Sequence, residues 1–582
     1  MTNTRTDFQP SIIDPITREI IGAALASAAE EMAVGLHRTA RSTIVRDALD
    51  FSTSLCNGSG EQIAQGTTIP LHLGAVPYAL ETMFAKYGDD ICPGDVFILN
   101  DPFQGGMHIP DIFVVKPIFD GDQRVAFAVA TAHHLDLGGR VPGSSACDNT
   151  EIFQDGLRIP WLKLYDKGKL RQPILDIIRA NVRVPDMTIG DLRAQLAACH
   201  TGEQAIFRII ERYGTETFIN CARDLIDYTE ALMRAEIAEW PDGESTFVDY
   251  MDSDGCNGPP VRIQCKISVE GDGLTADFEG TDPQVPGAIN STISYTASAV
   301  ALCTRAVMKM DIPNTAGMFR PLKVIVPHGS VLDPKMPGAS SMRGVTGFRK
   351  VDVIMGALAG IVPERVLAAC EGGNSLVIIG GARKGSHQPY VYYELVSGTW
   401  GARPDRDAND GLCNPGNVAG NIPIEEAECN YPIRIERYGL RKDTGGAGRY
   451  RGGMAVDREW TLLEGDAQLT IRSDRRDHLP YGLAGGKPGS GSMNILRRSD
   501  GEVELPVMVS TPMAAGETIY HQQPGGGGFG DPLTRAPNAV AVDVRADRVS
   551  VQAARDEYGV LLDEDGQVDI KGTEALRNER SG

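Results

Sequence analysis

The sequence predicts an α+β protein, a mixed multi-layer fold with an N-terminal α/β region and a β-rich, glycine-rich C-terminal region. Segments with helical periodicity and one strand hairpin fill the chain before about residue 240, whereas short alternating runs separated by Gly and Pro follow. Glycine is abundant, at 66 of 582 residues against a typical share of about 7%. We therefore expect three regions: 1–244, 245–535 and a charged C-terminal tail, 536–582.

The first expected element is one long helix over residues 15–45. Asp14 is a good capping residue and Pro15 suits the first helical position. Apolar residues recur every three or four positions from Ile20 to Leu36, which is typical of a helix that packs against the core.

A strand and a hairpin follow the helix. Residues 96–99 form a short apolar strand, and residues 112–119 and 124–133 are β-rich runs on either side of an Asp-Gly-Asp turn centred on Gly121. In an antiparallel pair with that turn, Asp111 should lie near Thr131 and Ile109 near His133. The start of the first strand therefore meets the end of the second.

The rest of the chain contains fewer long elements. Helical patterns cover residues 193–199, 217–240 and an Ala-rich stretch at 295–309. Residues 261–269 alternate as a strand does, and 430–530 is strongly β and glycine-rich.

Composition excludes several function classes. The formal charge of −21 and the lack of a long basic run argue against nucleic acid as a partner. The longest apolar runs are strand-sized, so no membrane span is expected, and the polar first 15 residues predict no secretory signal. Eleven scattered cysteines without a CxxC pair fit reduced thiols in the cytoplasm.

Histidines and aspartates gather at the two ends of the hairpin. Three of the ten histidines, His108, His133 and His134, lie within this short stretch, and Asp111 follows His108 by three residues. Two imidazoles and a carboxylate suit a divalent ion such as Zn²⁺ or Mn²⁺. Because neighbouring strand residues point to opposite faces, only one of His133 and His134 should join His108, and alternation does not say which. A capping aspartate with surface histidines is the alternative.

Other polar residues are weaker candidates. His72 could flank the same site or be a buried histidine with satisfied hydrogen bonds. Glu425 and Glu428 are best interpreted as part of a solvated helix face. For Cys147 the sequence shows no nearby general base that would activate it as a nucleophile. Three further residues could be polar site residues or loop formers: Asp410, Asn417 and Asn421.

Glycine tracts raise the question of a phosphate-binding loop. Residues 380–386 lack the GxxxxGK[ST] spacing, and residues 525–532 lack both the lysine and the strand-to-helix context. Tight turns in a β-rich region are the expected role of both tracts. The chain is thus predicted to have no ATP-phosphate site of its own.

Taken together, the motifs resemble the hydantoinase B/oxoprolinase family, which comprises the B-type subunits of ATP-dependent hydantoinases, 5-oxoprolinases and caprolactamases, with acetone and acetophenone carboxylase subunits as more distant relatives. The resemblance covers residues 15–535. The stretches that carry it are Asp50-Phe-Ser52, Ile69-Pro-Leu-His-Leu-Gly74, Asn100 to Asp111, His133 to Gly139, Asn181-Val-Arg183, Gly190-Asp-Leu192, Asn421 to Glu425 and Gly525 to Pro532.

The resemblance implies a set of metal ligands. Family members hold the ion with residues that correspond to Asp50, His108, Asp111 and His133, so the resemblance selects His133 over His134 and adds Asp50. His134 or Asp136 would then orient the ligands or accept a proton.

The resemblance also implies a partner and a reaction. ATP and Mg²⁺ would be used by a hydantoinase A-type ATPase subunit in an (αβ)2 heterotetramer. That subunit would phosphorylate a small cyclic amide, and the metal-bearing chain would activate water to open the ring. The alternatives are a subunit of an ATP-dependent ketone carboxylase and a non-catalytic structural subunit.

Overall fold

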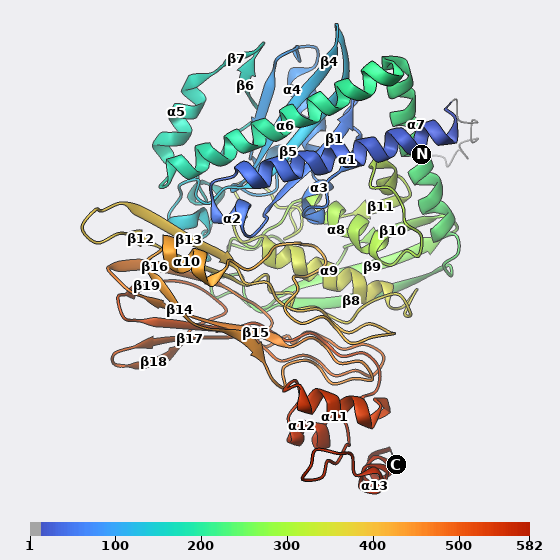
Figure 1. Ribbon diagram of the computed structural model, residues 1–582, viewed down its shortest axis with the longest axis vertical. Coiled ribbons are helices and arrows are strands. Elements are labelled where there is room, and N and C mark those ends of the chain that lie inside the picture. The colour runs from blue at the N-terminus through green and yellow to red at the C-terminus, as the bar shows by residue number, and fades with distance from the viewer. Residues whose placement is uncertain (1–12, 582) are drawn as a thin grey trace.

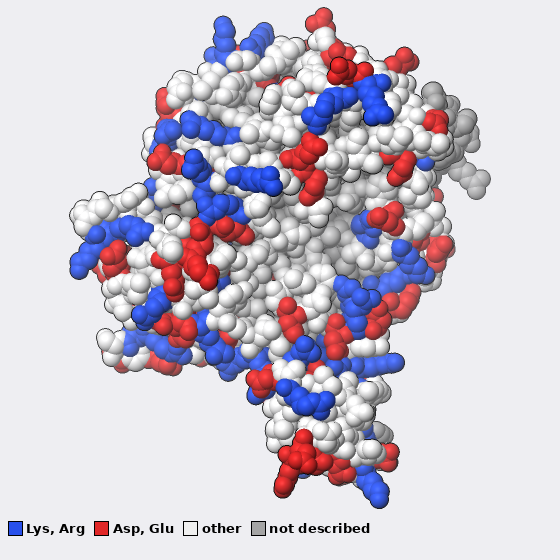
Figure 2. Space-filling model, viewed as in Figure 1, with Lys and Arg blue, Asp and Glu red and all other residues white. Residues whose placement is uncertain are grey.

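The protein is described by a computed structural model that covers residues 13–581. Helices and four sheets alternate along the chain, so the predicted α+β class is confirmed. Figure 1 shows the N-terminal sheet and its helices at the top, the β-rich part below them, and three C-terminal helices at the lower end. In the face drawn in Figure 2, Lys and Arg are interspersed with Asp and Glu rather than gathered in one patch.

The N-terminal part is built on a seven-stranded sheet with the order β2-β1-β5-β4-β3-β6-β7. The long helices α1 and α6 lie side by side across one face of it, where they pack on β1, β4 and β5 (Figure 1). The strands are β1 (Phe51–Asn57), β2 (Gln62–Gln65), β3 (Val96–Leu99), β4 (Asp111–Asp120), β5 (Gln123–His133), β6 (Leu162–Asp166) and β7 (Lys169–Leu170). The helices are α1 (Pro15–Thr39), α2 (Thr43–Arg46), α3 (Pro70–Leu73), α4 (Val76–Tyr87), α5 (Gln172–Asn181), α6 (Pro185–Tyr213) and α7 (Thr215–Ile237).

Helix α1 begins as predicted but ends earlier. The Asp14 side chain accepts hydrogen bonds from the N–H groups of residues 16 and 17. The predicted extension of this helix to residue 45 is wrong. The Asp191 carboxylate accepts hydrogen bonds from the N–H groups of Arg41 (2.6 Å) and Ser42 (3.1 Å), which therefore do not continue the helix. Ser42 then caps the separate helix α2. By length and composition alone α1 could cross a membrane, but here it packs along α6 and α7.

The hairpin of β4 and β5 has a different register from the predicted one. Asp111 pairs directly with His133, two residues along β5 from the expected partner, Thr131. A β-bulge between Ile118 and Phe119 shifts the ladder on one strand. The shift places Asp111 and His133 opposite each other at the sheet edge.

The central part surrounds a buried helix. All 15 residues of α9 are buried, and in Figure 1 this helix lies between the upper sheet and the lower ones. It packs on α8 and on strands β8 and β9 of a sheet with the order β11-β10-β9-β8. The elements are β8 (Gly243–Met251), β9 (Val261–Glu270), β10 (Gly273–Asp277), α8 (Ile293–Ala306), β11 (Leu322–Ile325) and α9 (Gly344–Leu358).

The predicted β-rich segment contains two further sheets with the orders β13-β12-β16-β19 and β14-β15-β20-β17-β18. A second apolar core, which includes Trp460 and Tyr392, packs between them. The elements are β12 (Leu376–Ala382), β13 (Pro389–Leu395), α10 (Ile424–Asn430), β14 (Ile433–Arg441), β15 (Ala455–Leu462), β16 (Asp466–Arg472), β17 (Met493–Arg498), β18 (Gly501–Glu504), β19 (Met508–Ala514) and β20 (Thr518–Gln522).

Residues 525–528 do not form the tight turns that we expected. None of these four glycines has a positive φ. The segment forms backbone hydrogen bonds with several other segments of the chain. Gly526 donates to the Gly453 carbonyl and accepts from Gly446, while Gly527 donates to the Ala369 carbonyl. Glycine is needed here for close approach of backbones rather than for turning. At residues 380–386 a turn is present, with Gly385 at a φ of +88°.

The C-terminal tail folds into helices α11 (Pro537–Arg545), α12 (Val551–Asp556) and α13 (Ile570–Ser581). A small apolar cluster that includes Val540, Tyr558 and Ala447 packs α11 and α12 onto the β-rich part. Arg577 of α13 donates to the carbonyls of Tyr558 and Arg535. The predicted boundary at 244/245 is crossed by the main core, which extends from Ile21 to Met508. The three regions therefore stay a prediction, and the first two share their packing.

We predict that Gly526→Ala strongly destabilises the fold, because its Cβ would lie 1.9 Å from the carbonyl oxygen of Trp400. A clash with backbone forces a shift, and overpacking of this kind costs about 1–3 kcal/mol or more. Urea denaturation measures the change. Gly273→Ala is the matched control, since its nearest atom would be 3.7 Å away. Equal stabilities for the two variants would contradict the close approach.

Candidate metal centre

Three strands of the N-terminal sheet end at one point. Asp50 immediately precedes β1, Asp111 is the first residue of β4, and His133 is the last residue of β5, the strand between them. The His133 N–H donates to the Asp50 carbonyl at 3.0 Å, and Asp111 pairs with His133. The sheet therefore fixes the relative positions of all three residues, which are buried.

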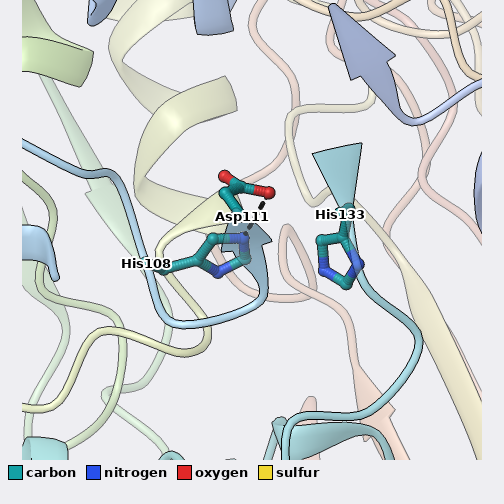
Figure 3. Close-up of side chains that lie close together, drawn as sticks. All are labelled: His108, Asp111 and His133. Atoms are coloured by element: carbon teal, nitrogen blue, oxygen red, sulfur yellow. Dashed lines mark ion pairs between the residues drawn. The ribbon is translucent and has the colours of Figure 1, made fainter. Parts of the chain in front are cut away.

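The loop before β4 brings in His108. Its Nε2 lies 3.1 Å from Oδ1 of Asp111, and its Nδ1 lies 3.3 Å from the carbonyl oxygen of Ser341. Figure 3 shows the His108 and Asp111 side chains in contact and His133 facing them from the end of β5. His108, Asp111 and His133 offer ligand atoms that all lie within 4.8 Å of one another.

A second group of donors shares Asp111. His72, in α3, has its Nε2 3.7 Å from Oδ1 of Asp50 and 3.9 Å from Oδ2 of Asp111. Its Nδ1 lies 3.2 Å from the Ser52 hydroxyl. Asp50, His72 and Asp111 thus form a trio with the same 4.8 Å spacing. The structure brings together the four ligands that the resemblance implies, distributed over two trios, and it adds His72.

Three site residues come from parts of the chain where sequence reasoning placed no candidate. Arg343, at the start of α9, forms an ion pair with Oδ2 of Asp111. The Tyr393 hydroxyl, from β13, lies 3.2 Å from Nε2 of His133. Arg472, at the end of β16, is buried near Asp50, and its positive charge opposes the rise in the Asp50 pKa that burial causes. No local spacing marks these residues, because their contacts join segments far apart in the chain.

Burial and neighbouring charges perturb the titration of the site. Burial raises the pKa of Asp50 to about 8, and the charge of Asp111 adds to the rise. Burial would also raise the pKa of Asp111, but the Arg343 guanidinium beside it holds that pKa well below its usual range. Burial lowers the pKa of His72 to about 4 and also lowers those of His108 and His133. The imidazoles are therefore held neutral, as metal ligands must be.

The contact between His108 and Asp111 indicates that a cation fits between them. A carbonyl oxygen only accepts, so Nδ1 of His108 carries the proton that points to Ser341, and neutral Nε2 presents a lone pair. That lone pair faces a carboxylate oxygen at 3.1 Å. In the described part of the chain, His108 Nε2, Asp111 Oδ1 and His133 Nδ1 are buried without a hydrogen-bond partner. A divalent ion would satisfy these atoms together.

His134 and Asp136 lie outside both trios. The His134 ring has Nε2 3.0 Å from Oε1 of Gln195, whose amide donates to the carbonyls of Ile112 and Ala130. The Asp136 carboxylate accepts from the N–H groups of residues 138, 143 and 183 and from the Arg183 guanidinium, at 2.9–3.0 Å. These bonds fix the chain that follows β5.

The weaker candidates take ordinary structural places. Glu425 and Glu428 are exposed on α10. Burial raises the pKa of the Cys147 thiol to about 12, and this thiol donates to the Ile471 carbonyl. Three polar side chains accept backbone N–H groups within loops: Asp410 from Met454, Asn417 from Ala419 and Asn421 from Ser397.

Comparison with known families identifies the family of the chain. The model of the family described as hydantoinase B/oxoprolinase matches residues 14–532. The chain belongs to this family. It is 33% identical to the B-type subunit of a "putative D-/L-hydantoinase" from a Pseudomonas species, over 99% of this chain and all of that protein.

Solved structures give the same result. The crystal structure of ATP-dependent caprolactamase from Pseudomonas jessenii matches with a TM-score of 0.92 and 32% identity, over 98% of this chain and all of the other. A nucleotide-free acetone carboxylase structure matches with a TM-score of 0.90 and 21% identity, over 98% of this chain and 83% of the other. The latter likeness concerns the fold alone.

We predict that Asp136→Asn destabilises the protein by about 2–4 kcal/mol, because it replaces one acceptor oxygen by a donor among buried N–H groups and removes the charge that faces Arg183. Urea denaturation measures the loss. Asp122→Asn, in the exposed hairpin turn, is the control and should stay within about 0.5 kcal/mol of the unaltered chain. An unchanged stability for Asp136→Asn would contradict this structural role.

Proposed function

We propose that the chain is the metal-bearing subunit of an ATP-dependent enzyme that hydrolyses a cyclic amide, such as a lactam, a hydantoin or oxoproline. The observation that carries the proposal is the buried contact of His108 Nε2 with Asp111 Oδ1, which a divalent ion would satisfy. The full-length similarity to a hydantoinase subunit and to caprolactamase supports the choice of substrate class.

Asp50, His108, Asp111 and His133 would hold the ion, with Zn²⁺ or Mn²⁺ favoured by two imidazoles and two carboxylates. His72 is available as a further donor or as a hydrogen-bonding neighbour of Asp50. A bound ion supplies Lewis acidity, which makes water a nucleophile near neutral pH.

The surrounding residues orient these ligands. The Ser341 carbonyl fixes the tautomer of His108. The Tyr393 hydroxyl forms a hydrogen bond with Nε2 of His133, so Nδ1 of His133 remains available to bind the ion. His134, through Gln195, and Asp136, through Arg183, hold the strand ends and the following loop. We assign His134 and Asp136 to positioning, with proton transfer as their alternative role.

A partner subunit would complete the enzyme. ATP and Mg²⁺ would be used by a hydantoinase A-type ATPase that phosphorylates the amide oxygen, since neither glycine tract of this chain has the spacing of a phosphate loop. We propose an (αβ)2 heterotetramer in the cytoplasm that acts on small neutral rings and binds neither nucleic acid nor membrane.

A ketone carboxylase subunit is the second candidate, favoured by the fold shared with acetone carboxylase. There the activated substrate would form a C–C bond with a carboxyl donor. A third candidate is a structural subunit in which the ion only braces the sheet edge.

We predict that Asp50→Ala, His108→Ala and His133→Ala each lower the affinity for the metal ion. The loss should exceed the roughly 10- to 100-fold that follows when a residue that only supports a ligand is removed. Elemental analysis after dialysis against buffered Zn²⁺ or Mn²⁺ measures the content. ATP-dependent ring opening with the partner subunit present should be lost in parallel. His328→Ala, an exposed histidine paired with Asp333, is the control. Full metal content and activity in the Asp50 and His133 variants would refute the proposal.

We predict that labelled bicarbonate leaves no label in a C–C bond of the product, because water rather than a carboxyl donor attacks the activated ring. Mass spectrometry of the product of the two-subunit enzyme measures this. Retained label would favour the carboxylase. Metal removal that lowers the melting temperature but leaves activity intact would favour the structural subunit.

A further inference from the structure

Buried cations gather beside the donor trios. Arg343, Arg472 and Lys350 are each at most 3% exposed. Among the described residues, Arg343 has one carboxylate within 4.0 Å, that of Asp111, whereas Arg472 and Lys350 have none. A buried guanidinium without an anion is costly, and such groups are normally paired. Arg472 is therefore a buried guanidinium that no carboxylate of the described chain pairs with.

Arg472 is held in place by neutral groups only. Its Nε donates to the carbonyl oxygen of Asn374 at 2.9 Å and its Nη2 donates to the side-chain oxygen of the same residue. Its Nη1 has only the Met342 sulfur at 3.8 Å, a weak acceptor. This nitrogen lies at the start of α9, 3.1 Å from where a Cβ of Gly344 would be. Nη1 is thus the one nitrogen of this guanidinium without an oxygen acceptor among the described residues.

Arg343 is anchored on an aromatic ring. Its guanidinium carbon lies 3.9 Å from the ring centroid of Tyr295, and Nζ of Lys350 lies 4.8 Å from the same centroid. Nε of Arg343 is buried without a hydrogen-bond partner among the described residues. Lys350 donates to the hydroxyls of Ser291 and Thr296, so these neutral groups fix its position.

Unpaired hydroxyls lie in the segment that leads into α9. Ser340 and Ser341 are at most 1% exposed, and neither hydroxyl has a hydrogen-bond partner in the described chain. The Asp155 carboxylate fixes both backbone N–H groups, at 2.9 and 3.0 Å. No side chain caps the 15-residue helix that follows. Buried donors without partners at an uncapped helix start favour an anion.

We propose that Arg343, Arg472 and the hydroxyls of Ser340 and Ser341 form an anion subsite beside the metal ligands, and that it takes the phosphoryl group of the activated substrate. The inference rests on the proposed function for the identity of that substrate. Because Arg343 bonds both this subsite and Asp111, a phosphoryl group held here would place the carbon it activates next to the donor trios.

A phosphoryl group fits better than a planar carboxylate. Nη1 of Arg472 and Nε of Arg343 are charged N–H donors that suit phosphate oxygens, and the hydroxyls and the helix start add neutral donors. A phosphoryl group also carries more negative charge than a carboxylate, so its attraction to the unpaired guanidinium of Arg472 is stronger.

The test is isothermal titration of the full-length chain, kept metal-free by a chelator, with inorganic phosphate and separately with bicarbonate. We expect phosphate to bind more tightly than bicarbonate. Arg472→Gln should weaken phosphate binding by about 10- to 100-fold, the effect of one charge-assisted contact. Arg472→Lys should retain part of the affinity, because lysine keeps the positive charge but lacks the planar guanidinium group. Arg497→Gln removes the same charge from a partly exposed ion pair with Glu459 and serves as the control.

The outcomes separate this inference from the proposed function. No phosphate binding, tighter bicarbonate binding, or equal phosphate affinity in the Arg472 and Arg497 variants would overturn the subsite, even if the metal and the ring-opening activity were present. Phosphate binding that depends on Arg472 would support it even if no ion bound. Melting curves check folding, and if both Arg472 variants unfold, Ser341→Ala replaces them, with a several-fold loss expected.

Discussion

The buried carboxylate of Asp111 connects every part of the site. One oxygen faces the bare Nε2 of His108 at 3.1 Å, and the other accepts from Arg343 and lies 3.9 Å from His72. Both donor trios therefore depend on one residue, and so does the link to the buried cations. A fully buried carboxylate is stable only when its charge is balanced, so Arg343 pairs with one oxygen and the proposed metal ion would bind the other.

The sheet gives this carboxylate a fixed position. Asp50, Asp111 and His133 stand at the ends of three adjacent strands, and backbone hydrogen bonds rather than flexible loops set their spacing. Central helix α9 then brings Arg343 from the opposite side, and strand β16 brings Arg472. Rigid elements on both sides are what a preorganised site requires.

Local patterns in the sequence predicted part of this arrangement. The turn at Gly121 and the flanking β-rich runs were enough to bring Asp111 to the end of β5 near His133, but the turn lies between Asp120 and Gln123, which moved the register by one residue, and the bulge moved it by one more. Alternation left His133 and His134 equivalent, and only family resemblance separated them. Arg343 could not be found, because its contact with Asp111 spans 232 residues. The glycines of 525–528 were misread because turns and close backbone packing both favour glycine.

X-ray absorption spectroscopy of the Zn²⁺-loaded chain tests the central claim most directly. We expect a first shell of nitrogen and oxygen at about 2.0–2.2 Å, with the multiple scattering of two imidazoles. The signal should be lost in Asp111→Ala. A sulfur shell at about 2.3 Å, or a spectrum without imidazole scattering, would contradict the proposed ligands.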